Sequence, residues 1–327
     1  MGRGCRAGGL HHACHRPQPR APLMTTIVTG ATGSFGRKVT EQLLEHLHPA
    51  ELILTTRDPA ALAKLAARGA HVRYADFDKP ETLAKAFEDG DRMLLISTLS
   101  VGRRATQHRH AIEAAVKAGV KHIAYTSSGG ATPGNPAIVI PDHLQTEETL
   151  KQSGVACTIL RNALYAEVPA TQIAPRALQA GQWVGSAGDG KVPFVSKLDC
   201  VACATRVLTS RGHESKTYEI TGPALLSYRD AAAIASDLSG KPIDYVVVRD
   251  DEMLALLLDA GVPRHYQEGM TTPGIGTSSA EDIVSYERGI REGHFAVKSD
   301  DVLQLLGRAP LSLRQVFEAN ANLLLQP

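Results

Sequence analysis

Short apolar runs alternate with longer stretches of helical periodicity over the first half of the chain. The apolar runs predict strands at Thr25–Thr29, Glu51–Thr56, His71–Tyr74, Arg92–Ser97, Lys121–Ser127 and Val155–Arg161. The stretches between them predict helices near Ser34–Leu47, Pro59–Arg68, Pro80–Glu88, Arg103–Ala118 and Asp142–Ser153. Such strict alternation is typical of an α/β protein with a Rossmann-like, doubly wound parallel sheet. The strands LILTT, MLLIS and HIAYTS are largely apolar, which indicates helices on both faces.

The regular alternation stops after Arg161, where glycine and proline become frequent. Shorter elements follow: a helix at Lys197–Thr209, a strand at Thr217–Thr221, a helix at Tyr228–Leu238, a strand at Ile243–Val248 and further helices. We therefore predict an NAD(P)-binding Rossmann domain at 24–161 and a smaller C-terminal α/β lobe for substrate at 162–327. Some segments of residues 162–327 can belong to the Rossmann domain.

Residues 1–23 differ in composition from the rest of the chain. They are rich in glycine, arginine, histidine and proline, and they contain no apolar segment of the signal-peptide kind. This composition predicts a disordered extension, so Met24 is an alternative start of the protein. The histidines at positions 11, 12 and 15 are typical of adventitious metal binding, and we expect no functional metal site.

The charge balance adds little to this picture. There are 35 lysines and arginines against 34 aspartates and glutamates, and beyond the first residues the bases are scattered, which disfavours nucleic acid or a membrane surface as a partner. No run of about 18 apolar residues predicts a transmembrane helix. The five cysteines form no disulfide framework and fit a reducing cytoplasm. We expect a soluble, cytoplasmic monomer or homodimer that acts on a small molecule.

Two of these cysteines, Cys200 and Cys203, form a CxxC pair. They stand in KLDCVACATRVL, whose apolar spacing predicts a helix packed on the core. We interpret the pair as two small buried residues rather than as a redox centre.

Three glycines lie between the first strand and the first helix, in VTGATGSFG. At this place glycines allow a tight turn and let a pyrophosphate approach the helix N-terminus. Their spacing differs from the usual Gly-x-Gly-x-x-Gly, and a plain strand-to-helix turn also uses glycine. Their position in a βαβ unit favours a dinucleotide. The residues predicted to contact it are Gly30, Ala31, Thr32, Gly33, Ser34, Phe35 and Gly36.

Arg57 follows the second strand, where NAD-selective sites usually have an acid and where an arginine suits a 2′-phosphate. This residue favours NADPH, although NADH stays possible. Asp58 is expected to cap the next helix ahead of Pro59. Open α/β sheets bind ligands beyond the carboxyl ends of their strands. Further cofactor contacts are therefore predicted at Asp76, Phe77, Ser97, Thr98, Leu99, Ser127 and Ser128.

Several longer segments resemble a known family. VTGATGSFG, ADFDKPETL, AGVKHIAYTSS, HLQTEETLKQSGVACTILRNALY and GSAGDGKV are similar to the NmrA-like atypical short-chain dehydrogenase/reductases, and within them to type 2 NAD(P)H:quinone oxidoreductases and triphenylmethane reductases. STLSVGRRATQHRHAIEAA resembles the quinone oxidoreductases most. The resemblance implies a Rossmann-like NADPH domain and a small C-terminal lobe, with the substrate in the cleft between them.

The proton donor of many short-chain dehydrogenases is absent. Those enzymes use Tyr-x-x-x-Lys, and aligning Glu147 with the acid that commonly follows this lysine puts His143 in the place of the lysine and Val139 in that of the tyrosine. This disfavours an alcohol dehydrogenase or an ordinary ketoreductase. His143, Asn162 and Tyr165 are the candidate catalytic residues. His143 as a helix cap, and Asn162 and Tyr165 as packing residues, are the alternatives.

Quinones and cationic dyes need no such donor. Hydride addition to a quinone gives an anion that water can protonate, and hydride addition to a cationic dye gives a neutral product. Positioning of the nicotinamide against the acceptor can therefore supply most of the catalysis. We therefore expect an NAD(P)H:quinone oxidoreductase that transfers hydride directly. Two alternatives stay open: an NmrA-like redox sensor without turnover, and a reductase of phenylpropanoid ethers or enones, whose relatives often keep the lysine that His143 replaces.

Overall fold

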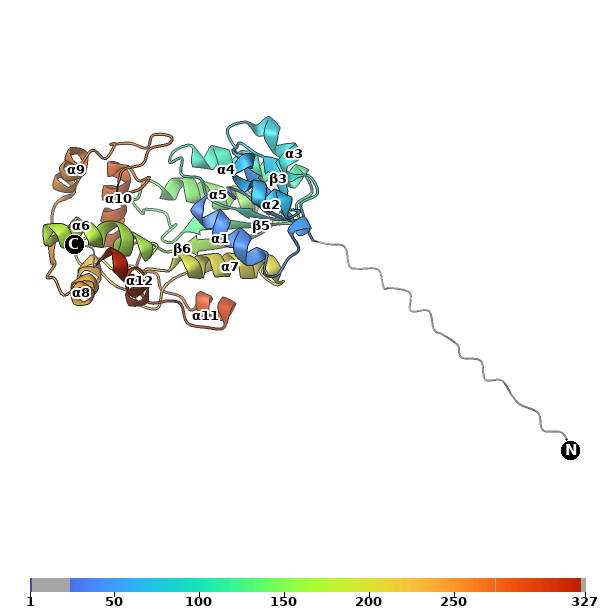
Figure 1. Ribbon diagram of the computed structural model, residues 1–327. Coiled ribbons are helices and arrows are strands. Elements are labelled where there is room, and N and C mark those ends of the chain that lie inside the picture. Colours follow the sequence, from blue (N-terminus) through green and yellow to red (C-terminus); the bar gives the residue numbers. More distant parts are fainter. Residues whose placement is uncertain (2–23, 274, 325–327) are drawn as a thin grey trace.

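The centre of the protein is a parallel sheet of seven strands in the order β3-β2-β1-β4-β5-β6-β8 (Figure 1). The computed structural model describes Met1 and residues 24–273 and 275–324. The strands are β1 (Thr26–Val28), β2 (Leu52–Thr56), β3 (His71–Tyr74), β4 (Arg92–Leu95), β5 (His122–Ser128), β6 (Ala156–Asn162) and β8 (Lys216–Ile220). The strand order reverses at β1 and β4, as in doubly wound sheets. The predicted Rossmann-like α/β class is confirmed.

Helices cover both faces of this sheet. On one face lie α1 (Ser34–Leu43), α2 (Ala63–Ala67), α7 (Lys197–Thr209) and α11 (Asp301–Leu306), and on the other α3 (Leu83–Phe87), α4 (Arg104–Lys117) and α5 (Ile140–Gln152). Neighbouring strand residues alternate between the two faces, since Val28 packs with the first group and Ile27 with the second. Both layers bury apolar side chains, which explains why β2 and β4 are buried along their whole length.

The remaining elements form a second lobe with its own apolar cluster. They are a short π-helix η4 (Val168–Ile173), α6 (Ala174–Ala180), β7 (Gln182–Gly185), α8 (Tyr228–Ser239), β9 (Asp244–Val247), α9 (Asp250–Asp259), α10 (Ala280–Arg291) and α12 (Leu313–Ala319). β7 and β9 pair in parallel as a separate two-stranded sheet. Trp183 on β7 is buried and faces Tyr228 of α8, with ring centroids 5.7 Å apart.

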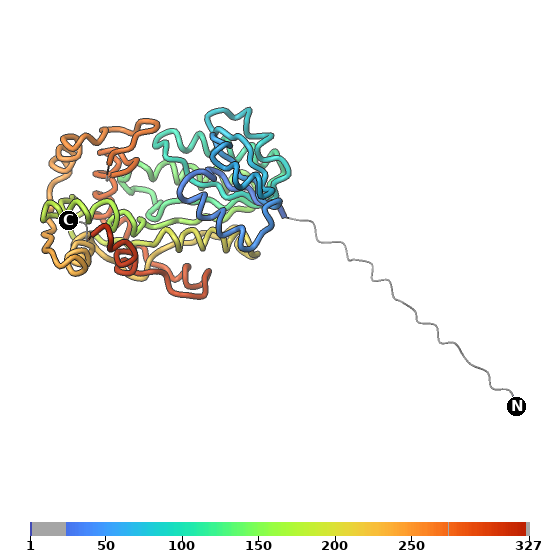
Figure 2. Tube along the Cα trace, viewed as in Figure 1, coloured from blue at the N-terminus to red at the C-terminus, as the bar shows by residue number. Residues whose placement is uncertain are grey.

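The chain passes back and forth between the two lobes. The tube in Figure 2 shows the C-terminal third mainly beside the green α6, while α11 lies beside α7 under the large sheet. β8 pairs with β6 and completes the sheet from the second half of the sequence. Cys200 and Cys203 on α7 are buried in this layer, and burial raises the pKa of both thiols. The interpretation of this CxxC pair as packing residues is confirmed.

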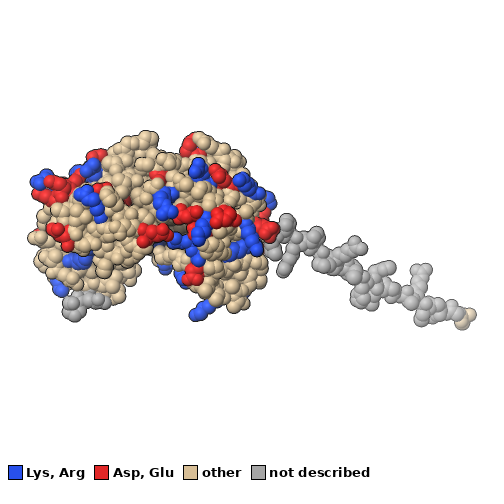
Figure 3. Space-filling view, turned by 90° about the horizontal axis from the view of Figure 1, so that it is seen from above, with Lys and Arg blue, Asp and Glu red and all other residues tan. Residues whose placement is uncertain are grey.

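Apart from Met1, the N-terminal extension predicted for residues 1–23 lies outside the described residues. On the face seen in Figure 3, basic and acidic side chains are interspersed. Within the described ranges, no helix has the length and apolar character that crossing a membrane requires.

Candidate functional site

A cavity of about 1310 Å³ opens at the carboxyl ends of the strands, between the large sheet and the second lobe. One wall consists of the loops that follow β1, β2, β3 and β4. The opposite wall includes residues of η4, α6, β7, α8, α9 and α10. This is the edge of a doubly wound sheet at which ligands bind. The volume exceeds the roughly 300–1,000 Å³ of ordinary small-molecule pockets, so there is room for two molecules.

The glycine turn after β1 is shaped for an anion. Gly30 has a φ of +58°, and a Cβ added to Gly36 would come within 2.9 Å of the Ala31 Cα atom, so neither position accommodates a side chain. Gly33 is the N-cap of α1, and no side chain caps this helix. The backbone N–H groups at its start are therefore available to a diphosphate, and the residues present fit a dinucleotide.

Most of the predicted contacts in this turn line the cavity. They are Gly30, Thr32, Gly33, Ser34, Phe35 and Gly36. Ala31 is buried and is not among the lining residues. The Thr32 and Thr56 hydroxyls lie 3.0 Å apart, which links the turn to the end of β2.

Arg57 lies at the cavity mouth, directly after β2. Its Nη1 atom is 2.8 Å from Oε1 of Glu268, a residue of the second lobe. Arg103 approaches the other oxygen of the same carboxylate at 3.8 Å. Two guanidinium groups thus converge on one anionic group beside the glycine turn. Asp58 caps the following 3-10 turn by accepting a hydrogen bond from Ala61 N–H at 3.4 Å, as expected.

The loops after β3 and β4 complete the first wall, and Asp76, Phe77, Ser97, Thr98 and Leu99 all line the cavity. Thr98 is held from two sides. Its N–H donates to Nε2 of His108 at 3.1 Å, and its carbonyl accepts from Nε of Arg104 at 2.6 Å. The roles of His108 and Arg104 could not be predicted from the sequence. Both side chains belong to α4 and contact Thr98 only through the way this helix packs on the sheet.

His143 belongs to the same buried network and is not among the residues that line the cavity. Its Nε2 atom is 3.1 Å from Nη1 of Arg104, and its Nδ1 atom is 2.7 Å from the Tyr125 hydroxyl. Burial, and next the charge of Arg104, hold the pKa of His143 well below its usual value of 6.5. The arginine can only donate, so Nε2 accepts and Nδ1 carries the proton. His143 is thus a neutral residue that contacts the arginine holding Thr98.

Val139, the N-cap residue of α5, lines the cavity and has no polar side chain. Ser127 and Ser128 at the end of β5 are not lining residues. Ser127 Oγ donates to Oε1 of Glu147 at 2.7 Å, and Glu147 forms an ion pair with Arg161. The predicted cofactor contacts Ala31, Ser127 and Ser128 do not line the cavity in this structure, and neither do the candidate catalytic residues His143 and Asn162.

Tyr165 lines the cavity after β6, and Asn162 lies behind it. Nδ2 of Asn162 is 3.4 Å from the Tyr165 hydroxyl, whereas its Oδ1 is buried with no hydrogen-bond partner among the described residues. The Lys197 ammonium group lies 5.2 Å from the centre of the Tyr165 ring. Burial raises the pKa of Tyr165, so its hydroxyl stays protonated at neutral pH.

The wall contributed by the second lobe is mainly apolar and aromatic. It includes Trp183, Tyr228, Leu257, Ile283 and Tyr286. Sequence reasoning missed this wall, since its residues come from four separate elements without a shared pattern. Asp282, one turn before Tyr286 on α10, adds one carboxyl group whose pKa burial raises to about 6.

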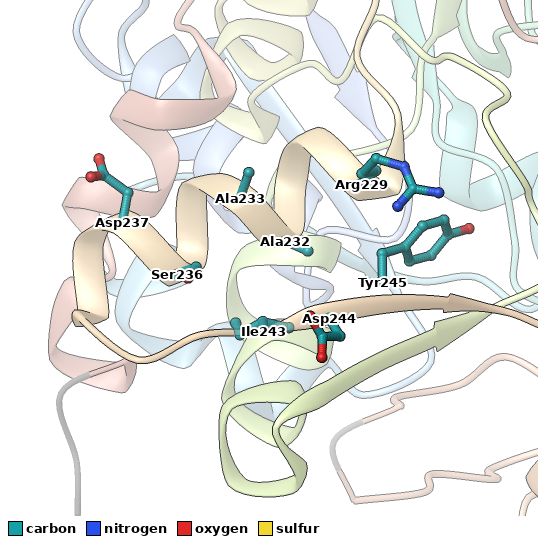
Figure 4. Close-up of a pocket in the computed structure, with 8 residues that line it drawn as sticks. All are labelled: Arg229, Ala232, Ala233, Ser236, Asp237, Ile243, Asp244 and Tyr245. Carbon is teal, nitrogen blue, oxygen red and sulfur yellow. The ribbon is translucent and has the colours of Figure 1, made fainter.

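A second hollow of about 440 Å³ lies between α8 and β9 (Figure 4). Arg229 extends over the Tyr245 ring there, 5.2 Å from its centre, and forms an ion pair with Asp189. Neither the glycine turn nor any strand end of the large sheet lines this hollow. The larger cavity is therefore the candidate active site.

Comparison with known proteins links this architecture to reductases. A family model described as NAD(P)H-binding matches residues 30–188. Quinone oxidoreductase 2 of Escherichia coli is 38% identical over 251 residues, which cover 77% of this chain and 87% of that protein. NAD(P)H azoreductase of Xenophilus azovorans is 29% identical over 244 residues. This match covers 75% of this chain and 84% of the azoreductase.

Solved structures agree with these matches. The NADPH complex of an NADPH-dependent quinone oxidoreductase from Escherichia coli has a TM-score of 0.82 and 34% identity, covering 91% of this chain and 99% of that one. The NADP(H) complex of triphenylmethane reductase from Citrobacter sp. has a TM-score of 0.80 and 30% identity, covering 91% of this chain and all of its own.

Proposed function

The chain belongs to the NAD(P)H-binding, NmrA-like family, and on this premise we propose that it is a reductase that transfers hydride from NAD(P)H directly to quinones and similarly electrophilic dyes. The names of its relatives cover a quinone, an azo dye and a triphenylmethane dye as acceptors. When bound, the reduced nicotinamide supplies the hydride.

One observation carries this proposal: a dinucleotide cradle and an apolar wall meet in a single cavity that lacks the usual tyrosine of α5. The glycine turn and Arg57 lie at one end, and Val139, Trp183 and Leu257 lie toward the second lobe. A quinone or a triarylmethyl cation needs positioning and exclusion of water more than it needs an acid. An acceptor of that class therefore suits this cavity better than an ordinary ketone does.

The chain's own residues have separable tasks in this proposal. The N–H groups at the start of α1 bind the diphosphate, and Thr98, held by Arg104 and His108, borders the ribose. The apolar wall of the second lobe holds a flat acceptor and excludes water. Tyr165, backed by Asn162, shapes the end of the pocket nearest to β6.

NADPH is the preferred cofactor in this proposal because of Arg57. The guanidinium group lies at the end of β2, where the adenosine ribose of a dinucleotide is bound, and in this structure it already holds a carboxylate. A 2′-phosphate is a stronger anion than a ribose hydroxyl and accepts charge-assisted hydrogen bonds from the same group.

Steady-state oxidation of NADPH tests the proposal. The acceptors are 1,4-benzoquinone, a cationic triphenylmethane dye, an azo dye and a simple enone. We expect turnover with the quinone and the dyes and little with the enone. Gly36→Val, whose side chain would collide with the Gly30 carbonyl, controls for contaminating reductases. NADPH binding without turnover of any acceptor would instead indicate a redox sensor.

A further inference from the structure

Hydride transfer to a quinone creates a charge that the protein must accommodate. The quinone takes up the hydride, the cofactor is oxidised to NAD(P)⁺, and a hydroquinone monoanion that still needs one proton is left. A hydrogen-bond donor aimed at a developing oxyanion increases the rate by roughly 10²–10³-fold. Val139, at the start of α5, has no polar atom in its side chain to serve as such a donor.

Helix α10 of the second lobe contacts the segment just before α5. Ser285 Oγ accepts a hydrogen bond from Ile138 N–H at 3.2 Å, although the two residues are 147 positions apart. The residues that follow these two, Tyr286 and Val139, both line the cavity. A tyrosine from α10 therefore lines the same cavity as Val139, and the residues that precede the two are in direct contact.

The Tyr286 ring is fixed in this position. It stacks on Phe295, with ring centroids 4.2 Å apart and an interplanar angle of 17°. The Phe295 ring in turn lies so close to Gly130 and Gly289 that a Cβ on either glycine would come within 2.7 Å of it. Gly130 belongs to the loop after β5. The stack thus joins α10 to the end of β5 and orients the phenol before a substrate arrives.

Burial raises the pKa of the Tyr286 phenol. A phenol with a raised pKa stays protonated at neutral pH. It donates a hydrogen bond throughout the reaction and does not give up its proton.

Resting on the proposed function, we infer that Tyr286 donates a hydrogen bond to the quinone oxygen on which negative charge develops. It performs from α10 part of the task that the tyrosine of Tyr-x-x-x-Lys performs from α5 in many short-chain dehydrogenases. The hydroxyl stabilises the hydroquinone monoanion, and water supplies the proton that completes the hydroquinone. A cationic triphenylmethane dye becomes neutral when it accepts a hydride, so this contact does not assist its reduction.

Tyr165 and Asp282 line the same cavity and are the alternatives for this role. The Tyr165 hydroxyl accepts a hydrogen bond from Nδ2 of Asn162 at 3.4 Å. Burial raises the pKa of Asp282 to about 6, and in its ionised form this carboxyl group opposes a neighbouring oxyanion. Tyr286, unlike Tyr165, belongs to the helix that hydrogen-bonds to the segment before α5, and its ring is fixed by the stack on Phe295.

Tyr286→Phe keeps the ring stack and removes only the hydroxyl. We expect kcat with 1,4-benzoquinone to fall by roughly 10²-fold, while the KM for NADPH and turnover of a cationic triphenylmethane dye change less than about twofold. Tyr165→Phe and Asp282→Asn test the competing groups. Tyr245→Phe is the matched control, because its buried hydroxyl has no hydrogen-bond partner in the described part of the chain and Tyr245 is outside this cavity.

Binding of 4-nitrophenolate to the NADP⁺ complex gives a second readout, since its absorbance responds to hydrogen bonding at the phenolate oxygen. We expect roughly tenfold weaker binding to Tyr286→Phe, as for the loss of one hydrogen bond to a charged group. Unchanged benzoquinone turnover, or an equal loss with both acceptors, overturns the role of Tyr286. A wild-type protein that reduces neither acceptor overturns the proposed function, and the inference with it.

Discussion

Arg57 and Glu268 form an exposed ion pair at the mouth of the cavity. An exposed pair of this kind is worth little by itself, so a bound phosphate can replace the carboxylate at small cost. In the proposed complex Arg57 instead binds the 2′-phosphate. Under the proposed function, the preference for NADPH depends on this one side chain.

We expect Arg57→Ala to weaken NADPH binding by roughly one to two decades, because a hydrogen bond to a charged group is worth about 1.5–3 kcal/mol. NADH lacks the phosphate, so its affinity should change little. Dissociation constants for both cofactors are the measurement, with Arg68→Ala as a control outside the cavity. Equal losses for NADPH and NADH would show that Arg57 does not select between them.

His143 lies behind the cofactor wall rather than at the reacting atoms. His143→Ala removes the partner of Arg104 and of the Tyr125 hydroxyl, and each buried group left unpaired costs about 1–3 kcal/mol of unfolding free energy. Turnover should fall by less than the roughly 10²–10⁴-fold typical of a lost general acid. The remaining effect should appear in the KM for NADPH, because Arg104 holds Thr98.

Urea denaturation and steady-state kinetics measure the two effects, with His46→Ala, exposed after α1, as the control. The pKa of His143 lies well below 6.5, so the wild-type rate profile should show no histidine limb near that pH. The opposite outcome is a His143→Ala variant that binds NADPH normally but loses a thousandfold in kcat, with a limb near pH 6.5 in the rate profile of the wild type that the variant lacks. That result would identify His143 as the general acid.

Helix α1 and the turn before it act as one unit. Gly36→Ala places a Cβ atom within 2.9 Å of the Ala31 Cα atom, and backbone, not a flexible side chain, must move. We expect a loss of about 1–3 kcal/mol in unfolding free energy and weaker NADPH binding, because the displaced turn misaligns the N–H groups. Lys38→Ala, on the exposed side of the same helix, is the control. If Gly36→Ala bound NADPH with wild-type affinity, the glycine turn would not be part of the cofactor site.

Most elements of the first half could be predicted because their signals are local. The strand expected at His71–Tyr74 and the helix expected at Lys197–Thr209 have these bounds in the structure. The helix expected from Asp142 begins two residues earlier, at Ile140, because Pro141 suits a first turn. β7 was not predicted, since AGQWVGSAGDGKVP contains glycines typical of a loop and β7 exists through its pairing with β9.

The second lobe is held together by buried polar groups as well as by its apolar cluster. Glu287 on α10 accepts hydrogen bonds from the Ser186 N–H and hydroxyl groups, just after β7. Burial raises the pKa of Glu287 to about 7 from an ordinary value of 4.5. Between these pH values the native state holds a proton that the unfolded state has lost. Its contribution to stability therefore falls as the pH rises through this window.

The side chain of Glu287→Gln cannot ionise. We expect the difference in melting temperature between this variant and the wild type to shift in favour of the variant as the pH is raised from 5 to 8. Thermal melting over this range is the measurement, and Glu292→Gln, exposed at the end of the same helix, is the control for removing one carboxylate. A difference between variant and wild type that does not change with pH would contradict the raised pKa of Glu287.

The sequence by itself determined the doubly wound sheet, the glycine turn and the family, because periodicity, turn chemistry and segment resemblance are properties of neighbouring residues. Arg57 was also visible, since its place is counted from the second strand. Only the tertiary structure decided that His143 is buried beside Arg104, that Glu268 reaches Arg57 and that Ser285, beside Tyr286, contacts Ile138 before α5. Glu268 and Arg57 are 211 positions apart. Contacts at such separations depend on how the second lobe packs against the sheet, and no local pattern along the chain encodes that packing.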